Sequence, residues 1–212
     1  MKIAGLILAA LFLGLCLPGE EKIMAIEPGA NNPVGGPGLK VGTVAPDFTG
    51  VTYMGNKIRL SDVYKNGPVV LIFYRGAWCP YCNLHLQSFQ KRLKDFEKLG
   101  ATILAVSIDK PEYGAETVKD NSLGFEVISD TQANILEAYK VIYKVPDQLA
   151  EKYRNEYQID LEAHSGRTDH LIAIPATYII DKTGKIVFAY ANEDYKVRTQ
   201  PNEVLDVLEK LK

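Results

Sequence analysis

Two cysteines placed three positions apart are the residues of this sequence best suited to do chemistry. Cys79 and Cys82 enclose Pro80 and Tyr81 in the stretch YRGAWCPYCNLH. A cysteine reacts as its thiolate, and a Cys-X-X-Cys pair at the start of a helix commonly has one lowered pKa. One thiolate can attack a substrate, and the second can release it as an internal disulfide. We therefore predict a redox dithiol in which Cys79, at the exposed lip of the helix, attacks and Cys82, one turn inside, resolves.

Two other roles of the cysteine pair stay open at this point. Structural zinc takes four ligands, usually from two such pairs. Cys16 is the only other cysteine, and of the three histidines His85 is close enough to be a third ligand. A structural disulfide across the pair would close too short a loop to restrain the unfolded chain much. We expect no metal, and no organic cofactor either, since the sequence has no glycine fingerprint for a dinucleotide.

Three neighbours of the pair are candidates for tuning it. Trp78 directly precedes Cys79, and Arg75 comes just before the turn. The arginine would supply positive charge to the thiolate or to an anionic substrate, unless it is a solvated residue at the end of a strand. His85 falls on the same helix face as Cys82, where an imidazolium would favour a nearby thiolate. The alternative for His85 is a partly exposed surface histidine.

The elements on either side place the dithiol at a junction between a strand and a helix. The continuous apolar run over 69–74 predicts a strand that is covered on both faces. Pro80 suits the first helical position, and apolar residues then recur at helical spacing as far as Leu99. Gly100 is the expected end of this helix.

The rest of the chain alternates between strand and helix signals. We expect a hairpin over 51–60, strands over 102–108 and 126–128, helices from Pro111 and over 129–139, a hairpin over 176–190 and a helix from Pro201. This order predicts an α/β fold, with a central mixed sheet flanked by helices. The segment 143–170 fits the alternation poorly. It is interpreted as an insertion near the site, with a short helix over 146–157.

The pattern of the N-terminal region predicts a leader followed by a tether. Lys2 precedes an apolar run over 3–17, which is shorter than the roughly 20 residues needed to span a bilayer. We predict an export signal over 1–25, a Gly-, Pro- and Asn-rich tether over 26–40, and one redox domain over 41–212. The net charge of −2 gives no electrostatic footprint for nucleic acid.

Several blocks of the chain resemble a known family from residue 41 to the C-terminus. They are APDF at 45–48, FYRGAWCPYC at 73–82, SID at 107–109, SDTQANILEAYKV at 129–141, IPATYIIDKTGKIVFAY at 174–190 and DYKVRTQPNEVLDVL at 194–208. Together they resemble the peroxiredoxin-like (alkyl hydroperoxide reductase/thiol-specific antioxidant) branch of the thioredoxin-fold superfamily. The resemblance implies a thioredoxin-like fold. It also implies that Pro175 is a cis proline lying against the dithiol.

The chain departs from the peroxide pocket that the resemblance implies. Typical peroxiredoxins carry Pro-x-x-x-Thr-x-x-Cys and an arginine from a distant strand. When Cys82 is aligned with the reactive cysteine of that motif, Arg75 stands at the proline position and Cys79 at the threonine position. Pro175 stands where the distant arginine is expected. Which cysteine reacts with peroxide is therefore open, and Arg75 is a candidate substitute for the missing arginine.

Three functions follow from these observations. The first is an antioxidant enzyme that reduces hydroperoxides, with a thioredoxin-like or other thiol as electron donor. The second is a thiol–disulfide oxidoreductase acting on protein disulfides, and the third is a tethered, non-catalytic binding module. The leader implies export to a bacterial periplasm or cell envelope. Because Cys16 follows Leu13-Gly14-Leu15, the leader also resembles a lipoprotein signal, and a lipidated Cys16 would tether the domain to a membrane.

Overall fold

The centre of the fold is built from strands whose residues are all buried. The computed structural model describes residues 36–211, so the predicted export signal, Cys16 and most of the tether lie outside the described residues. Strands β3 (Val69–Phe73) and β8 (Ala176–Ile180) are buried at every position. Apolar runs of this kind need cover on both faces, which places the two strands in the middle of a layered sheet.

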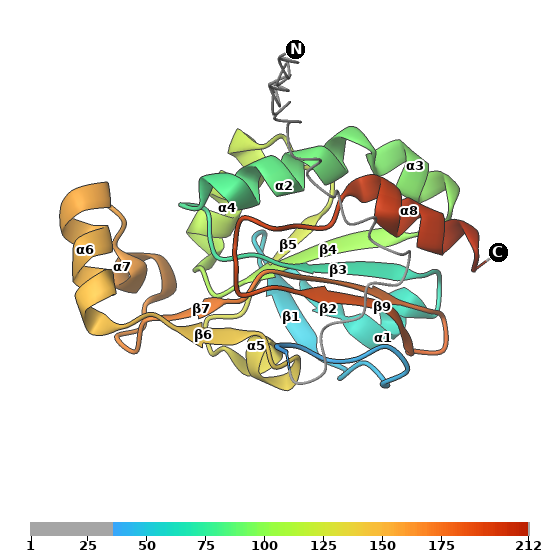
Figure 1. Ribbon diagram of the computed structural model, residues 1–212. Helices are drawn as coiled ribbons and strands as arrows, with labels where there is room; N and C mark the ends of the chain where they lie inside the picture. Colours follow the sequence, from blue (N-terminus) through green and yellow to red (C-terminus); the bar gives the residue numbers. More distant parts are fainter. Residues whose placement is uncertain (1–35, 212) are drawn as a thin grey trace, which may run out of the picture.

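These two strands belong to a seven-stranded mixed sheet (Figure 1). Its order is β2-β1-β5-β4-β3-β8-β9. The remaining strands are β1 (Thr49–Thr52), β2 (Lys57–Arg59), β4 (Thr102–Ser107), β5 (Glu126–Ser129) and β9 (Ile186–Ala191). Strand β4 runs parallel to both β3 and β5, whereas the pairs β3–β8, β8–β9, β1–β5 and β1–β2 are antiparallel. The sheet therefore has the predicted mixed character, with the predicted hairpins at its two edges.

Helices cover both faces of the sheet, as the alternation of elements predicted (Figure 1). On one face lie α2 (Pro80–Lys91), α3 (Leu93–Lys98), α4 (Pro111–Asp120) and α8 (Pro201–Glu209). The short helices α1 (Leu60–Tyr64) and α5 (Asn134–Ala138) lie on the other face. Each face has its own hydrophobic core, and both cysteines belong to the core beneath α2 and α8.

Two helices are shorter than predicted. The helix from Pro80 breaks at Arg92, whose φ of −109° and ψ of 8° are not helical, and resumes as α3. Gly100 ends that segment with a φ of +72°, as expected of a terminating glycine. The helix predicted over 129–139 starts only after Ala133, since Ser129 belongs to β5 and Ala133, with a φ of +61°, is not helical. Asp130 accepts hydrogen bonds from the backbone N–H groups of Ile135 and Leu136 and so holds the start of α5.

The segment 143–170 is an insertion that projects from one end of the sheet (Figure 1). Its base is a two-stranded antiparallel sheet of β6 (Ile142–Lys144) and β7 (Leu171–Ala173). Between them come α6 (Asp147–Tyr157), close to the predicted helix, and the additional helix α7 (Leu161–Ser165). A small separate core of Val145, Ala150, Leu161 and Ile172 lies inside the insertion.

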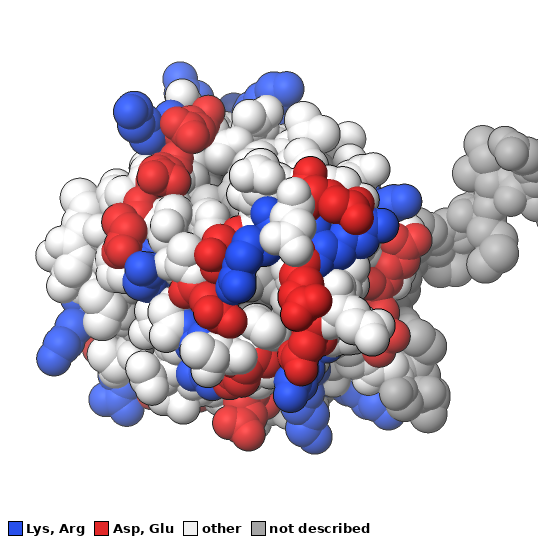
Figure 2. Space-filling view, turned by 90° about the vertical axis from the view of Figure 1, so that its left-hand side faces the viewer, with Lys and Arg blue, Asp and Glu red and all other residues white. Residues whose placement is uncertain are grey.

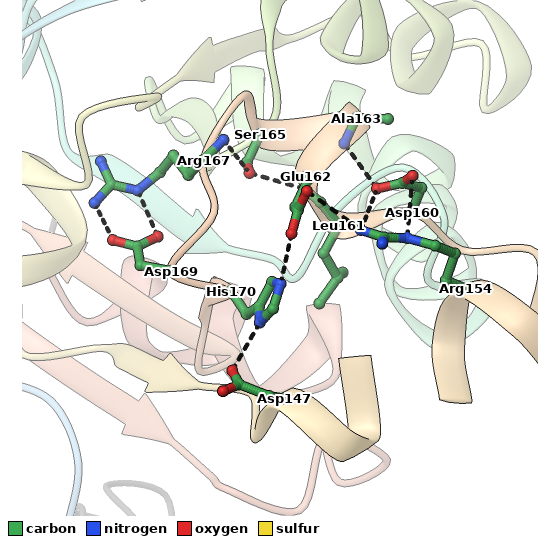
Figure 3. A network of polar contacts seen from close by, with 10 residues as sticks. All are labelled: Asp147, Arg154, Asp160, Leu161, Glu162, Ala163, Ser165, Arg167, Asp169 and His170. Carbon is green, nitrogen blue, oxygen red and sulfur yellow. Dashed lines mark hydrogen bonds and ion pairs between the residues drawn. The ribbon is translucent and has the colours of Figure 1, made fainter. Parts of the chain in front are cut away.

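A polar network joins the helices of the insertion (Figure 3). The two ring nitrogens of His170 lie 3.1 Å from a carboxylate oxygen of Asp147 and 3.0 Å from one of Glu162. Arg154 forms ion pairs at 3.3 Å with both Asp160 and Glu162. Lys and Arg side chains alternate with Asp and Glu on this side of the molecule (Figure 2). The insertion is thus fixed by a small core together with matched charges.

Packing against the domain already begins inside the segment predicted as tether. The Gly38 N–H donates to the carbonyl of Lys140 at 2.9 Å, and the Leu39 N–H donates to the hydroxyl of Tyr178 at 3.0 Å. Within residues 36–211 no helix is both long and apolar enough to cross a membrane.

Candidate active site

The dithiol lies at the N-terminus of α2, as the sequence predicted. Cys79 is the N-cap residue, Pro80 occupies the first turn, and Cys82 follows inside the helix. Both cysteines are free thiols, so the structure represents the reduced state. The N-terminus of a helix presents unpaired N–H groups and a partial positive charge, which favour an anionic sulfur.

Both cysteines are fully buried, so the predicted exposure of Cys79 is wrong. Each has a relative exposure of 0%, and both pack in the core that contains Leu86 and Phe89. Cys79 is buried despite its N-terminal position on α2, and the side chain of Arg75 contacts it. The Arg75 Nη1 atom lies 4.0 Å from the Cys79 Sγ atom. Substrate therefore reaches Cys79 only when something above it moves.

The surroundings of the two sulfurs set their pKa values in opposite directions. The pKa of Cys79 is lowered to about 6, and the largest cause is a hydrogen bond from the Cys82 thiol. The Cys82 backbone N–H and the charges of Arg75 and Arg198 lower it further, whereas burial raises it. Burial is the main cause that raises the pKa of Cys82 well above 9.0, helped by the neighbouring Cys79. At neutral pH the pair therefore holds one negative charge, on Cys79, which is the sulfur predicted to attack.

Arg75 is held over Cys79 by aromatic side chains from three parts of the chain. Its guanidinium carbon lies 4.7 Å from the ring centroid of Trp78 and 4.2 Å from that of Tyr195. Its Nη2 atom donates to the hydroxyl of Tyr153, in α6, at 2.9 Å. With 6% exposure, Arg75 is not the solvated residue that was the alternative. Arg75 stabilises the Cys79 thiolate, and Trp78 helps to hold Arg75 in place.

A second arginine, Arg198, contacts the other sulfur. Its Nη2 atom lies 3.4 Å from the Cys82 Sγ atom, and its Nε atom donates to the carbonyl of Tyr195 at 2.7 Å. The backbone N–H of Arg75 also donates to the Cys82 sulfur at 3.4 Å. Each sulfur thus has its own arginine.

The prediction that His85 could act as an imidazolium is wrong. His85 is buried, and burial together with the charge of Arg198 lowers its pKa to about 4, so the ring is neutral at neutral pH. Its Nε2 atom lies 3.0 Å from the carbonyl oxygen of Thr199, which can only accept, so Nε2 carries the proton. His85 therefore anchors the residue that follows Arg198, and it is not a surface histidine either.

Pro175 lies in the site, but its expected cis bond is not found. Residues 36–211 contain no cis peptide bond. Two residues, Ile174 and Pro175, carry the chain from β7 to β8. The Ile174 N–H donates to the carbonyl of Val141 at 2.7 Å, and the Asn192 N–H donates to the carbonyl of Pro175 at 3.2 Å. Pairing on both sides keeps this connection extended, and a trans peptide suits that path.

A cavity of about 320 Å³ is lined by Arg75, which separates it from Cys79, and neither cysteine belongs to its wall. Arg75 and Tyr195 form one side of it, and Pro175 belongs to its wall. Tyr143, Leu149 and Tyr153 of the insertion complete the lining together with Ile172, Ala173, Ile174 and Glu193. The insertion therefore lies near the site, as the sequence predicted, and supplies part of the cavity.

Asp109 is a buried acid that supports the loop before the dithiol. Its Oδ2 atom accepts from the backbone N–H of Ala77 at 2.7 Å. Burial raises its pKa to about 7. Its Oδ1 atom has no hydrogen-bond partner and lies 3.8 Å from Nδ1 of His164, which comes from the insertion.

The described residues do not supply a third zinc ligand to the cysteine pair. Within residues 36–211 no group of three or more His, Cys, Asp or Glu side chains is arranged to hold a metal ion. His85, the candidate from the sequence, directs Nε2 at the carbonyl of Thr199. The site is thus built from two sulfurs and two arginines.

Sequence reasoning missed Tyr153, Tyr195, Arg198 and Asp109 as parts of the site. All four lie in blocks that carried the family resemblance or in the insertion assigned near the site. The signal in DYKVRTQ was a tyrosine and an arginine in an otherwise irregular stretch before α8. Asp109 ends the block SID, directly after β4.

Comparisons with known proteins identify relatives of this chain. The model of the AhpC/TSA family matches residues 41–189. A putative peroxiredoxin of Mycobacterium tuberculosis is 30% identical over 154 residues, which cover 73% of this chain and 86% of that protein. The thiol-disulfide oxidoreductase ResA of Geobacillus kaustophilus is 34% identical over 104 residues, covering 49% of this chain and 59% of that one.

Solved structures support the fold. The crystal structure of peroxidoxin BcpB from Mycobacterium tuberculosis has a TM-score of 0.65 at 21% identity, covering 82% of this chain and 99% of that one. A peroxiredoxin-like protein from Aquifex aeolicus has a TM-score of 0.64 at 22% identity, with coverage of 84% and 90%. The fold is thus thioredoxin-like, and the chain is a thiol-dependent oxidoreductase rather than a non-catalytic binding module. By sequence and fold together, the chain belongs to the peroxiredoxin-like AhpC/TSA family.

Proposed function

We propose that this protein reduces hydroperoxides through a cycle in which Cys79 and Cys82 alternate between dithiol and disulfide. The observation that carries the proposal is the opposite displacement of the two pKa values, to about 6 for Cys79 and well above 9.0 for Cys82. At neutral pH this gives one nucleophilic thiolate beside one protonated thiol, which are the two species that the cycle needs.

In the first step the Cys79 thiolate attacks one oxygen of the hydroperoxide. A sulfur–oxygen bond forms and the oxygen–oxygen bond breaks, so Cys79 becomes a sulfenic acid and the alkoxide takes up a proton to leave as an alcohol. Arg75, 4.0 Å from the Cys79 sulfur, is the cation beside the reacting atoms. Negative charge moves from sulfur to the leaving oxygen, and Arg75 stabilises it there.

In the second step Cys82 attacks the sulfenic sulfur of Cys79. A disulfide forms, the sulfur–oxygen bond breaks and water leaves with the proton of the Cys82 thiol. Cys82 must become anionic for this step, and Arg198 lies 3.4 Å from its sulfur. An external thiol donor then returns two electrons and two protons to the disulfide.

The setting of the reaction belongs to the same proposal. The leader over 1–25 supports export to a bacterial periplasm or cell envelope. A lipidated Cys16 would hold the domain at a membrane through the residues that precede the fold. A thioredoxin-like or other exported thiol protein would serve as electron donor.

A second candidate function is reduction or formation of disulfides in other proteins. It is favoured by the relative named thiol-disulfide oxidoreductase ResA and by the absence of the peroxiredoxin threonine, whose position Cys79 occupies. In that case Cys79 attacks a substrate disulfide, one substrate thiolate leaves, and Cys82 resolves the mixed disulfide by releasing the second.

Paired assays with cysteine variants separate these functions. The reduced protein would be given hydrogen peroxide, and separately insulin, beside Cys79→Ser and Cys82→Ser. Without an electron donor we expect the wild type and Cys82→Ser to consume one equivalent of peroxide each, the wild type ending as a disulfide and Cys82→Ser with a sulfenic acid trapped on Cys79, while Cys79→Ser consumes none. Addition of dithiothreitol should make peroxide consumption by the wild type catalytic. Insulin reduction without peroxide turnover would establish the second function. A sulfenic acid on Cys82 in Cys79→Ser would reverse the assigned roles.

A further inference from the structure

Cys79 combines a thiolate that suits attack with complete burial, and this combination needs an opening movement. Arg75 contacts the sulfur, with Nη1 at 4.0 Å, and also lines the neighbouring cavity, which the sulfur itself does not reach. The position of Arg75 depends on one hydrogen bond and two cation–ring contacts, which involve Tyr153, Trp78 and Tyr195. The covering group is therefore held by few contacts, each of modest free energy.

Two of the three groups that hold Arg75 also line the cavity. Tyr153 and Tyr195, together with Arg75 itself, form part of the wall of the 320 Å³ space. A molecule that enters this space therefore touches Arg75 and two of the side chains that decide where its guanidinium lies.

The lining of the cavity selects a class of occupant. Carbon-rich side chains of Tyr143, Leu149, Ile172 and Ile174 face it, and Glu193 is its acidic member. Its volume is near the lower end of the roughly 300–1,000 Å³ range of small-molecule sites. An apolar or aromatic group fits this lining, and the opposite charges of Glu193 and Arg75 together favour neither an anion nor a cation.

We propose that the cavity binds an uncharged apolar or aromatic group of the substrate and that this binding moves Arg75 away from Cys79. The inference rests on the proposed function, because it concerns how a substrate reaches the Cys79 sulfur. Hydrogen peroxide has no such group and gains nothing from the cavity. The insertion, which supplies Tyr143, Leu149 and Tyr153 to the wall, is therefore a specificity element.

The first experiment measures how well Arg75 shields Cys79. The rate at which iodoacetamide alkylates Cys79 would be followed by mass spectrometry on the plateau of its pH profile, where the thiolate is fully formed. Tyr153→Phe removes the hydrogen bond to Arg75 and keeps the ring, so we expect alkylation about fivefold faster, which is the effect of one hydrogen bond. Tyr157→Phe, the same change on the same helix at an exposed position, should leave the rate unchanged.

The second experiment tests the cavity with N-ethylmaleimide and N-benzylmaleimide, which share one chemistry. Each rate on Cys79 would be divided by the rate on free cysteine. We expect the benzyl reagent to be favoured about tenfold in the wild type, since a buried aromatic group gains one to several kcal/mol. Leu149→Gln, which keeps a good helix former while making the wall polar, should remove most of that preference.

Two outcomes would overturn the proposal: equal alkylation rates for Tyr153→Phe and Tyr157→Phe, or a benzyl preference that is absent or survives Leu149→Gln. Tyr195→Leu repeats the shielding test from the loop before α8, in case Tyr153→Phe disturbs α6. Neither experiment requires peroxide turnover. A protein that passes both tests but consumes no hydroperoxide would therefore refute the proposed function alone.

Discussion

At the scale of single residues, the acidity of Cys79 comes from its neighbours and not from exposure. The hydrogen bond from the Cys82 thiol is the largest cause of the lowered pKa, and it outweighs burial. The two cysteines are therefore one chemical unit, in which the protonated partner stabilises the charged one. A substitution of Cys82 must therefore change the pKa of Cys79.

Removal of the Cys82 thiol should raise the pKa of Cys79. In Cys82→Ala the donor to the Cys79 sulfur is lost, so we expect the midpoint of thiolate formation to move upward from about 6. The ultraviolet absorbance of the thiolate, titrated against pH, measures this directly. Cys82→Ser is the matched control, since its hydroxyl can still donate. A midpoint that stays the same in Cys82→Ala would assign the acidity to the arginines and the helix terminus.

Loss of Arg198 should slow the second step of the cycle more than the first. Its Nη2 atom is 3.4 Å from the Cys82 sulfur, which becomes anionic in that step. A hydrogen bond to a charged group contributes about 1.5–3 kcal/mol, so we expect Arg198→Met to slow disulfide formation at least about tenfold. The decay of the Cys79 sulfenic acid after a peroxide pulse gives the rate. Lys196→Met removes an exposed cation from the same loop and should decay like the wild type.

What the sequence revealed at this scale was limited to residues close in the chain. Arg75, Trp78 and Pro80 were found because they lie within a few positions of Cys79. Arg198 is 116 positions from Cys82, and Tyr153 is 78 positions from Arg75. Their contacts depend on how the insertion and the last loop fold back, which no local spacing encodes. His85 was correctly placed on the helix face of Cys82, but its burial and its contact with the carbonyl of Thr199 were not predicted.

At the scale of elements, local patterns predicted the strands and the start of α2 well. Continuous apolar runs and proline at the first helical turn depend on neighbouring residues alone. The interruption of the helix at Arg92 and the late start of α5 were missed, because both depend on packing of the chain around them. The insertion was recognised as a break in the pattern with one short helix, which corresponds to α6. Its second helix, α7, and its paired strands required the structure.

The polar network of the insertion should depend more on Glu162 than on Asp147. Both carboxylates meet His170, but the Asp147 side chain is 81% exposed and that of Glu162 is 38% exposed. Glu162 also pairs with Arg154. Exposed ion pairs contribute about 0–1 kcal/mol, so Asp147→Asn should change little while Glu162→Gln costs up to about 1 kcal/mol locally.

Hydrogen exchange of the α6 and α7 amides would measure this difference (Figure 3). Faster exchange confined to these helices in Glu162→Gln, with unchanged exchange in the central sheet, is the expected result. Equal protection in both variants would show that the small core of the insertion holds the helices without the charges.

At the scale of the whole molecule, two buried groups give the stability opposite dependences on pH. Burial raises the pKa of Asp109 from 3.8 to about 7, so between these values the folded protein holds a proton that the unfolded chain lacks. Its contribution is complete at low pH and is lost as pH rises through about 7. Burial lowers the pKa of His85 from 6.5 to about 4, and its contribution instead appears as pH rises through that range.

Asp109→Asn should therefore make the free energy of unfolding rise more steeply between about pH 4 and pH 7 than in the wild type. The variant lacks the Asp109 carboxyl, whose contribution to stability decreases as pH rises over this range. The asparagine oxygen can still accept a hydrogen bond from the Ala77 N–H. Urea unfolding at several pH values across this window gives the slope. Parallel curves for the two proteins would mean that Asp109 is ionised throughout in the folded state.

The contacts that stabilise the Cys79 anion under α2 have an electrochemical consequence. Folding, protonation and oxidation form one thermodynamic cycle, in which whatever stabilises the folded dithiol relative to the folded disulfide raises the reduction potential, by 30 mV for each 1.4 kcal/mol. The Cys79 anion is stabilised by its neighbours only while it is reduced. The contacts that lower the pKa of Cys79 thus also favour the reduced dithiol over the disulfide. A thiol donor of modest reducing strength therefore suffices to reduce the disulfide.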